Sequence, residues 1–361
     1  MYDIAVIGAG INGCSIAYEL SSAKKNVVVF DTTIANGGSG AAGAFISPKF
    51  SKAGELKEIL HDAFVYSMEF YEKNFPKSFQ KTRLLHIAKD EKDDEILRVY
   101  KDKTTLKLFD KDIGVRENIS IDSGIVDAQS VCKELLNGIK FIPHNVDTLE
   151  FDNGYWIINE SYSAKEVVLA TGAYKSVIEE PYIKLRGVWG HRIDIETSTT
   201  NNLSIHQFVS ISPSKDGVIA IGATHNVHYH PETSTQEYDI DDGRAELLKK
   251  ASMTIKLDDI KIIKDYTGLR SGSFDYMPMI GGLVLSDETL QDKTINFKVK
   301  KVDTSKYLYY PNLYMINGSG GYGFVLAPYL AKILKDHILS SKDISDRLTP
   351  IRFFTRWAKK L

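Results

Sequence analysis

The feature that most constrains this chain is a glycine-rich turn near its start. Gly8, Gly10 and Gly13 follow an apolar run at residues 4–7, and residues 11–22 have helical composition. When such a unit binds a dinucleotide, the first glycine allows a tight turn, the second lets a pyrophosphate approach the backbone, and the third lets the helix pack closely on the strand. The N-terminus of the helix directs its positive dipole end at the phosphates. The spacing predicts an α/β fold with a Rossmann-like domain whose cofactor contacts Gly8, Gly10, Ile11, Asn12 and Gly13.

An acidic residue stands where such a site needs one. A second apolar run, residues 26–30, ends at Asp31. A carboxylate at the end of the second strand accepts hydrogen bonds from the ribose hydroxyls of adenosine. The alternative is a tight turn in an unrelated α/β protein. Because strand, helix and acidic residue are all in place, we favour dinucleotide binding, but these residues do not choose between NAD and FAD.

Three later small-residue segments favour FAD. Residues 37–43 form a loop at a suitable distance to line a flavin, residues 168–172 form a strand that ends in a small-residue turn, and residues 317–323 form a glycine-rich turn that leads into a helix. A helix N-terminus at the pyrimidine end of a flavin stabilises negative charge on the reduced ring. Ordinary turns explain each segment alone, but not all three in this order. The predicted cofactor contacts in these segments are Gly38, Ser39, Gly40, Thr171, Gly172, Gly318, Gly320, Gly321, Tyr322 and Gly323.

Composition narrows the class of protein. The chain has 361 residues, of which 43% are hydrophobic and 25% charged, and its net charge is −2. This balance is typical of a globular protein of about two domains without an overall bias toward nucleic acid or anionic membranes. Its two cysteines, Cys14 and Cys132, show no disulfide or metal-ligand spacing. No apolar run is long enough to span a membrane, and the chain enters a strand at once, so we expect a cytoplasmic protein that has no contact with membranes.

The order of these motifs resembles the D-amino-acid oxidase superfamily, which includes glycine oxidase and sarcosine oxidase. In that family a strand valine contacts the adenine, and Val146 matches it. Residues 267–281 are similar to the segment in which an arginine binds the substrate carboxylate beside the cofactor, so the resemblance gives that role to Arg270. A planar guanidinium can hold a carboxylate bidentately and so orient the α-carbon. The alternative for Arg270 is a structural ion pair.

Residues 38–51, 62–71 and 221–225 are similar to the FAD-dependent domain of the MnmC family of tRNA 5-methylaminomethyl-2-thiouridine biosynthesis enzymes. This resemblance implies oxidative removal of the carboxymethyl group from carboxymethylaminomethyl uridine at the tRNA wobble position. The products would be glyoxylate and the aminomethyl uridine, and molecular oxygen would reoxidise the FAD. These enzymes are commonly fused to a methyltransferase domain, which this sequence does not show, so methyl transfer would need a separate protein.

The main alternative is an oxidase or dehydrogenase of a free amino acid such as glycine, sarcosine or a D-amino acid. It predicts a small closed pocket, whereas a tRNA substrate predicts an open entrance flanked by Arg and Lys. A flavin monooxygenase fits less well, because its usual C-terminal Gly-Asp motif is replaced by Asn-Gly-Ser-Gly at residues 317–320.

The expected organisation is a discontinuous FAD-binding domain of the glutathione-reductase type, made of residues 1–82, 124–184 and 305–345. Residues 83–123 and 185–304 contain many short strands with polar turns, which predicts a second, mainly antiparallel β domain for the substrate. Residues 346–361 form a basic-aromatic tail. This tail either contacts the backbone and unstacked bases of a tRNA or packs its rings as a helix against the body.

The candidate catalytic side chains are Arg270, Tyr322, Lys49 and His191. Amine oxidation by a flavin depends on positioning the substrate, so we expect no catalytic triad and no metal site. The positive charge of Lys49 would promote electron transfer to oxygen, unless it is a surface lysine. His191 either lines the pocket or is a structural histidine.

The remaining pocket candidates are His225 and Tyr266. His225, His228 and His230 alternate along the chain, which a strand explains better than a metal site does. Both cysteines fall in predicted helices, away from the flavin, so we expect the FAD to be bound non-covalently.

Overall fold

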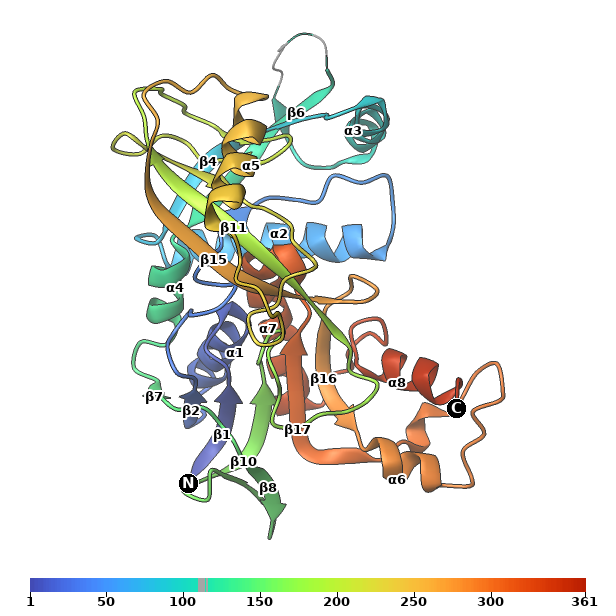
Figure 1. Cartoon of the computed structure of the whole chain (residues 1–361). Coiled ribbons are helices and arrows are strands. Elements are labelled where there is room, and N and C mark those ends of the chain that lie inside the picture. The colour runs from blue at the N-terminus through green and yellow to red at the C-terminus, as the bar shows by residue number, and fades with distance from the viewer. Residues whose placement is uncertain (110–113, 115) are drawn as a thin grey trace.

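The computed structural model describes residues 1–109, 114 and 116–361 and contains two sheets, one above the other in the view of Figure 1. In the lower sheet the strand order is β16-β17-β10-β1-β2-β7, and β17, β10, β1, β2 and β7 run parallel. A hairpin of β8 and β9 pairs with the start of β10. The strands of this sheet are β1 (Tyr2–Ile7), β2 (Val27–Phe30), β7 (Lys140–Ile142), β8 (Leu149–Asp152), β9 (Tyr155–Ile158), β10 (Tyr162–Leu169), β16 (Met279–Val284) and β17 (Tyr309–Asn317).

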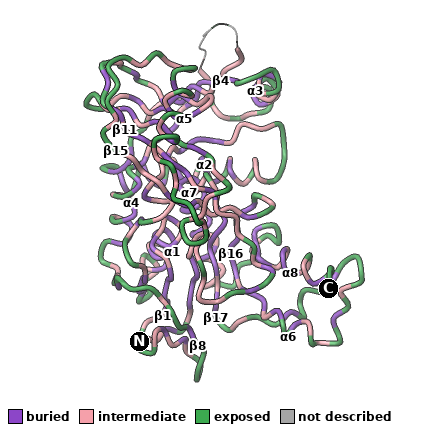
Figure 2. Tube along the Cα trace, viewed as in Figure 1, coloured by how far each residue is buried: buried purple, intermediate pink, exposed green. Residues whose placement is uncertain are grey.

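The central strands are apolar because both faces of the lower sheet are covered. In β1, Ile4 and Val6 belong to one buried cluster and Ala5 to another on the opposite face. Figure 2 shows β1 and its neighbours as largely buried tubes. The first cluster packs against four helices: α1 (Ile11–Ser22), α2 (Glu55–Asn74), α4 (Ala128–Leu135) and α7 (Gly323–Ser340).

The upper sheet is mainly antiparallel and is dominated by one long strand pair. Strands β11 and β15 pair from Leu185 opposite Ser273 to Glu196 opposite Lys261, and Figure 1 shows this pair running diagonally from the upper sheet toward the lower one. Only β12 and β4 pair in parallel in the described part of this sheet. Its strands are β3 (Phe45–Ile46), β4 (Phe79–Ile87), β5 (Leu108–Phe109), β6 (Asn118–Val126), β11 (Leu185–Glu196), β12 (Ser204–His206), β13 (Ser210–Ile211), β14 (Val218–Gly222) and β15 (Lys261–Ser273).

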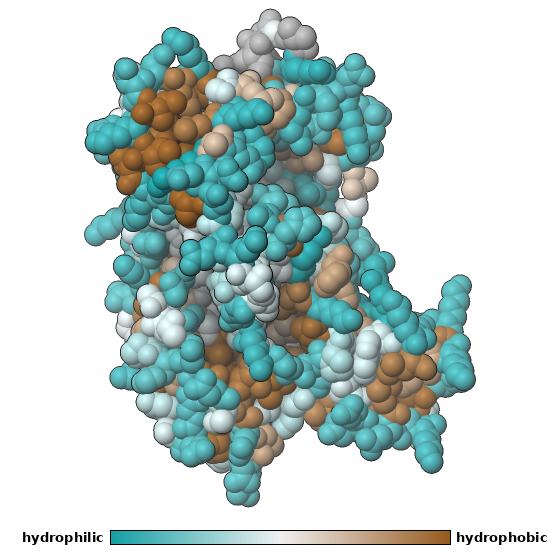
Figure 3. All heavy atoms as spheres, in the orientation of Figure 1, coloured by the Kyte–Doolittle hydropathy of each residue, from teal (hydrophilic) through white to brown (hydrophobic). Residues whose placement is uncertain are grey.

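Two further helices and two short helical segments lie outside the core. The helices α3 (Glu91–Lys103) and α5 (Ile240–Ser252) lie beside the upper sheet, and α6 (Ser286–Gln291) and η1 (Thr304–Lys306) follow β16. Figure 3 shows a mostly hydrophilic face with apolar side chains gathered over the upper ends of β11 and β15. Among the residues described, no helix combines the length and apolar character that crossing a bilayer requires.

The predicted α/β class is confirmed, but the predicted domain ranges differ from sheet membership. Strand β16 falls within the range 185–304 assigned to the substrate domain, yet it pairs with β17 in the lower sheet. Strands β4 and β6 cross the predicted boundaries at 82/83 and 123/124. The sequence of a short apolar strand does not show which other strand it will pair with. The sheet that such a strand joins therefore cannot be predicted from local sequence. Residues 110–113 and 115 of the predicted range 83–123 lie outside the described structure.

The C-terminal tail is a packed helix, α8 (Ile351–Ala358). Phe353 and Phe354 are 7% and 0% exposed, so neither ring is free to stack on a base. Arg352 donates from Nε to Asp275 at 2.8 Å and from Nη2 to the Met277 carbonyl at 2.7 Å. Of the two interpretations of the tail, packing against the body therefore applies to these aromatic rings.

Candidate active site

A cavity of about 1060 Å³ lies where the carboxyl ends of the parallel strands of the lower sheet meet the upper sheet. This is where ligands bind in open α/β sheets. The predicted site residues that line it are Gly8, Gly10, Ile11, Asn12, Asp31, Gly38, Ser39, Lys49, Val146, Thr171, Gly172, Arg270, Gly320, Gly321, Tyr322 and Gly323. Four predicted residues are not among its lining: Gly13, Gly40, Gly318 and His191.

The first turn has the close packing that its glycines predict. Gly8 has a φ of 110°, a conformation that favours glycine. A Cβ on Gly13 would lie 1.9 Å from the carbonyl oxygen of Gly8, so this glycine lets α1 pack on the turn although it does not face the cavity. The Oγ of Ser39 accepts a hydrogen bond from the Ile11 amide at 2.9 Å, which joins the second glycine loop to the start of α1.

The carboxylate of Asp31 is fixed at the edge of the cavity. Its Oδ2 accepts from the Ala9 amide at 2.7 Å, and its Oδ1 accepts from the Thr32 amide at 2.7 Å. An ionised carboxylate has about four acceptor positions, so capacity remains for ribose hydroxyls. Val146 lines the same cavity.

Asn317 ties three segments together at the other end of the cavity. Its Nδ2 donates to the Gly172 carbonyl at 2.9 Å, and its Oδ1 accepts from the Ser271 hydroxyl and from the Gly318 amide, both at 2.8 Å. The helix α7 then begins at Gly323, beside the cavity. A Cβ on Gly321 would meet no atom within 4 Å, which leaves room for a ligand close to the backbone. The two glycine-rich helix starts at one cavity fit an FAD, whose diphosphate would lie at α1 and whose flavin would lie at α7.

Arg270 on β15 carries the positive charge of the cavity wall. Its Nη2 donates to the Thr224 carbonyl at 3.1 Å, and no carboxylate forms an ion pair with it in the described part of the chain. The guanidinium lies over Gly190, where an added Cβ would clash with Nη2 at 2.2 Å. Burial lowers the pKa of Arg270 from its ordinary value. A half-buried guanidinium with free donors fits a carboxylate ligand and does not support the alternative of a structural ion pair.

Lys49 and Tyr322 face each other in the cavity. The Lys49 Nζ lies 5.3 Å from the centre of the Tyr322 ring, which is within the range of a cation–π contact. Burial lowers the pKa of the Lys49 ammonium and raises the pKa of the Tyr322 hydroxyl. Lys49 is therefore a cavity residue and not a surface lysine, and the catalytic roles of both residues stay predictions.

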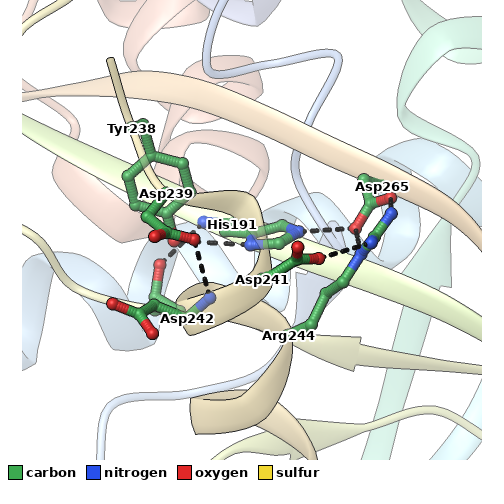
Figure 4. Close-up of polar contacts among 8 residues, drawn as sticks. His191, Tyr238, Asp239, Asp241, Asp242, Arg244 and Asp265 are labelled. Carbon is green, nitrogen blue, oxygen red and sulfur yellow. Dashed lines mark hydrogen bonds and ion pairs between the residues drawn. The ribbon is translucent and has the colours of Figure 1, made fainter. Parts of the chain in front are cut away.

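Of the two interpretations of His191, the structure supports the structural one, because His191 does not line the cavity. His191 is fully buried on β11, and Figure 4 shows it between Tyr238 and Asp265. Its Nε2 lies 2.9 Å from Oδ1 of Asp265, and the Tyr238 hydroxyl lies 3.3 Å from its Nδ1. Hydrogen bonding by Arg244, followed by that of His191, lowers the pKa of Asp265. Because side chains alternate along a strand, His191 points away from the face on which its neighbour Gly190 lines the cavity.

The other two pocket candidates do not line the cavity. Tyr266 lies under Arg192, whose Cζ is 3.8 Å from the ring centre. Burial and the nearby charge of Arg270 lower the pKa of His225. Within the described residues, no group of three His, Cys, Asp or Glu side chains could hold a metal ion. Cys14 and Cys132 are buried and free and do not line the cavity, so neither offers a sulfur to the flavin.

Sequence reasoning missed four rings in the cavity wall: Phe45, Phe50, His86 and His206. They come from β3, the loop after it, β4 and β12, so residues up to 161 positions apart form one surface. No local motif marks them, and only the pairing of β4 with β12 brings the two histidines together.

Comparison with known proteins decides the family. The model of the family described as "DAO: FAD dependent oxidoreductase" matches residues 3–337. The chain belongs to this family of FAD-dependent oxidoreductases. It is 26% identical to the tRNA 5-methylaminomethyl-2-thiouridine biosynthesis bifunctional protein MnmC of Campylobacter concisus, over 98% of this chain and 60% of that protein. The chain thus spans about three fifths of the length of this curated relative.

Solved structures show the same fold. Glycine oxidase from Bacillus cereus superposes with a TM-score of 0.73 and 18% identity, over 95% of this chain and 96% of that one. L-proline dehydrogenase from P. horikoshii gives a TM-score of 0.74 and 17% identity, over 98% and 97% of the two chains. The chain therefore shares the fold of these enzymes and belongs to a family of FAD-dependent oxidoreductases, and the cavity is the candidate site for cofactor and substrate.

Proposed function

We propose that this enzyme oxidises an N-carboxymethyl amine carried by the wobble uridine of a tRNA, and so releases the carboxymethyl group as glyoxylate. The observation that carries the proposal is the unpaired guanidinium of Arg270 in the wall of the FAD cavity. An N-substituted glycine presents a carboxylate one carbon from its amine, so a guanidinium that holds the carboxylate also places the C–H bond to be broken. Similarity to MnmC proteins over nearly the whole chain supports tRNA as the carrier.

Bound FAD supplies the acceptor for the hydride that leaves the carbon between the carboxylate and the amine. The chain's own residues position the substrate for this step. Arg270 keeps donors free for the carboxylate because, among the described residues, its guanidinium donates only to the Thr224 carbonyl. Water then hydrolyses the substrate imine to glyoxylate and the aminomethyl uridine.

Lys49 is proposed to hold positive charge beside the reacting groups. Its Nζ lies 5.3 Å from the centre of the Tyr322 ring, and burial lowers its pKa. A cation in a partly buried site stabilises negative charge that develops on oxygen when the enzyme is reoxidised. Molecular oxygen is the proposed acceptor, and hydrogen peroxide is the expected product.

A free amino acid is the second candidate substrate. Arg270 would hold the carboxylate of glycine or sarcosine as well as that of a modified uridine, so this residue alone does not separate the two. The volume of the cavity, about 1060 Å³, has to hold FAD as well as the substrate, so it does not separate the two candidates.

The test compares tRNA with free amino acids. Purified FAD-loaded protein is incubated with tRNA carrying carboxymethylaminomethyl uridine, and the digested nucleosides are analysed by mass spectrometry. Peroxide release is measured in parallel with glycine and sarcosine. Conversion of the tRNA nucleoside with little peroxide from the amino acids supports the proposal. Turnover of the amino acids alone would replace it with the second candidate.

A further inference from the structure

The cavity wall contains a recess of four aromatic rings that the proposed oxidation does not use. The ring centroids of Phe50 and His86 are 4.5 Å apart, and those of Phe45 and His206 are 5.1 Å apart. The two imidazoles are 6.3 Å apart, and all four residues line the cavity. These separations are those of aromatic rings packed against one another, and a flat ligand can contact the sides of the rings that line the cavity.

The two imidazoles have unused hydrogen-bonding capacity. Nδ1 of His86 and Nε2 of His206 are buried and have no partner, and neither ring makes any hydrogen bond to the described residues. Burial lowers the pKa of both rings, to about 4 for His86 and about 3 for His206. Each ring is therefore neutral near pH 7 and offers one donor and one acceptor. Such groups are costly to bury unless a ligand uses them.

The pairing of the strands places this recess on the same side of the upper sheet as Arg270, the proposed carboxylate anchor. Arg192, Gly222, Ser210, His206 and His86 are paired one after another across β11, β14, β13, β12 and β4. Paired residues point to the same face of a sheet, so this row faces the side where Gly190, two residues before Arg192, lies under the guanidinium of Arg270. The side chain of Arg192 fills the space directly over Gly222, where an added Cβ would lie 2.8 Å from Cγ of Arg192. The two ends are nevertheless joined by one cavity, whose lining includes Gly190, Gly222, Ser210, His206 and His86.

The distance between Arg270 and the recess limits which ligands can contact both. His206 is three strands from β11, which is roughly 14 Å at the backbone before the side chains extend. A free glycine held by Arg270 does not reach the recess. A ligand with an arm of four single bonds that ends in a six-membered ring spans roughly 10 Å. Hydrogen bonds and ring contacts at its two ends cover the remaining distance to the protein atoms.

We propose that His86 and His206, with Phe45 and Phe50, form the subsite for the pyrimidine base that carries the carboxymethylamino arm. This inference rests on the proposed function, since it requires the substrate to be a modified nucleoside. Rings of the recess stack on the base, and the imidazoles exchange hydrogen bonds with its polar edge. The recess thus distinguishes a uridine-borne amine from a free amino acid that shares the same carboxylate anchor.

The test uses FAD-loaded protein and two probes that share the anchor but differ in the base. One probe is 5-carboxymethylaminomethyluridine, and the other is N-methylglycine. The dissociation constant of each is measured from changes in the visible flavin spectrum, or from the rate of anaerobic flavin reduction. The variants are His86→Phe and His206→Phe, which keep a flat ring and remove its nitrogens. Ser210→Ala, on the same row, is a milder change, and His337→Phe near the far end of α7 is the matched control.

The expected result is a selective loss. Each of the two ring variants raises the dissociation constant of the nucleoside tenfold or more and changes that of N-methylglycine less than twofold. Ser210→Ala raises the nucleoside constant about threefold, and His337→Phe changes neither. An unchanged nucleoside constant in all the row variants, or equal weakening of both probes, would overturn the subsite while the proposed function stands. A wild-type protein that binds N-methylglycine but not the nucleoside would overturn both.

Discussion

Replacing Arg270 with methionine should abolish substrate oxidation and at the same time stabilise the ligand-free protein. Among the described residues, Arg270 has no ion pair, and its guanidinium donates one hydrogen bond, to the Thr224 carbonyl. Its charge therefore faces the cavity, where the carboxylate of a bound substrate can pair with it. Methionine keeps much of the length of the side chain and removes the charge.

The magnitude follows from the free donors of the guanidinium. A bidentate contact with a carboxylate makes two charge-assisted hydrogen bonds, and its loss costs roughly 3 to 5 kcal/mol. That corresponds to a fall of about 10²- to 10⁴-fold in kcat/KM. Arg270→Lys keeps the charge but not the planar fork, so its loss should lie between those of wild type and Arg270→Met. Removal of an unpaired, half-buried charge should raise the melting temperature of the ligand-free variant.

Stopped-flow reduction of the flavin without oxygen measures the chemical step directly. The visible flavin spectrum of Arg270→Met must match that of the wild type, which shows that the cofactor site is intact. A kcat/KM for reduction within threefold of the wild type would refute the assigned role. A strong fall in melting temperature would instead show that Arg270 is a structural residue.

Four further substitutions test other parts of the site. Lys49→Met should slow reoxidation by oxygen at least tenfold and leave flavin reduction unchanged. In the wild type, fast reoxidation should be lost as the pH rises through the pKa of Lys49, because only the protonated ammonium carries the charge. Burial lowers this pKa, so the loss should occur at a lower pH than for an exposed lysine. Gly13→Ala should prevent FAD retention or folding, because its Cβ would lie 1.9 Å from a carbonyl oxygen, whereas Gly321→Ala should fold and bind FAD more weakly, as read from the flavin content. His191→Phe should lower the melting temperature by breaking the contacts with Asp265 and Tyr238 and leave kcat within threefold; a large fall in kcat at unchanged stability would contradict its structural role.

Local sequence signals pointed to segments that line the cavity at the starts of α1 and α7. The turn from Gly8 to Gly13 and the turn before α7 depend on a glycine spacing between one strand and the next helix, and such spacing is visible without knowledge of the fold. Arg270 was found from its similarity to a family segment. The structure adds that this side chain is unpaired and lies over Gly190, which the sequence does not show.

The parts that were missed depend on strand pairing over long sequence separations. His86 and His206 meet only because β4 pairs with β12, and β16 joins the lower sheet only because it pairs with β17. The face on which His191 lies stayed open because a single residue along a strand changes the face of the sheet, and the phase of β11 was not known from sequence. The residue types at these positions suggest possible roles, but the sequence does not show to which face of the sheet each side chain points.

The most direct test of the central claim is anaerobic titration of the yellow, FAD-loaded protein with an anticodon stem-loop that carries carboxymethylaminomethyl uridine. We predict that the visible flavin band bleaches with one equivalent of the modified RNA, and that the same RNA with an unmodified uridine leaves the band unchanged. A band that persists with the modified RNA, in a protein that glycine or sarcosine does bleach, would contradict a tRNA-borne substrate.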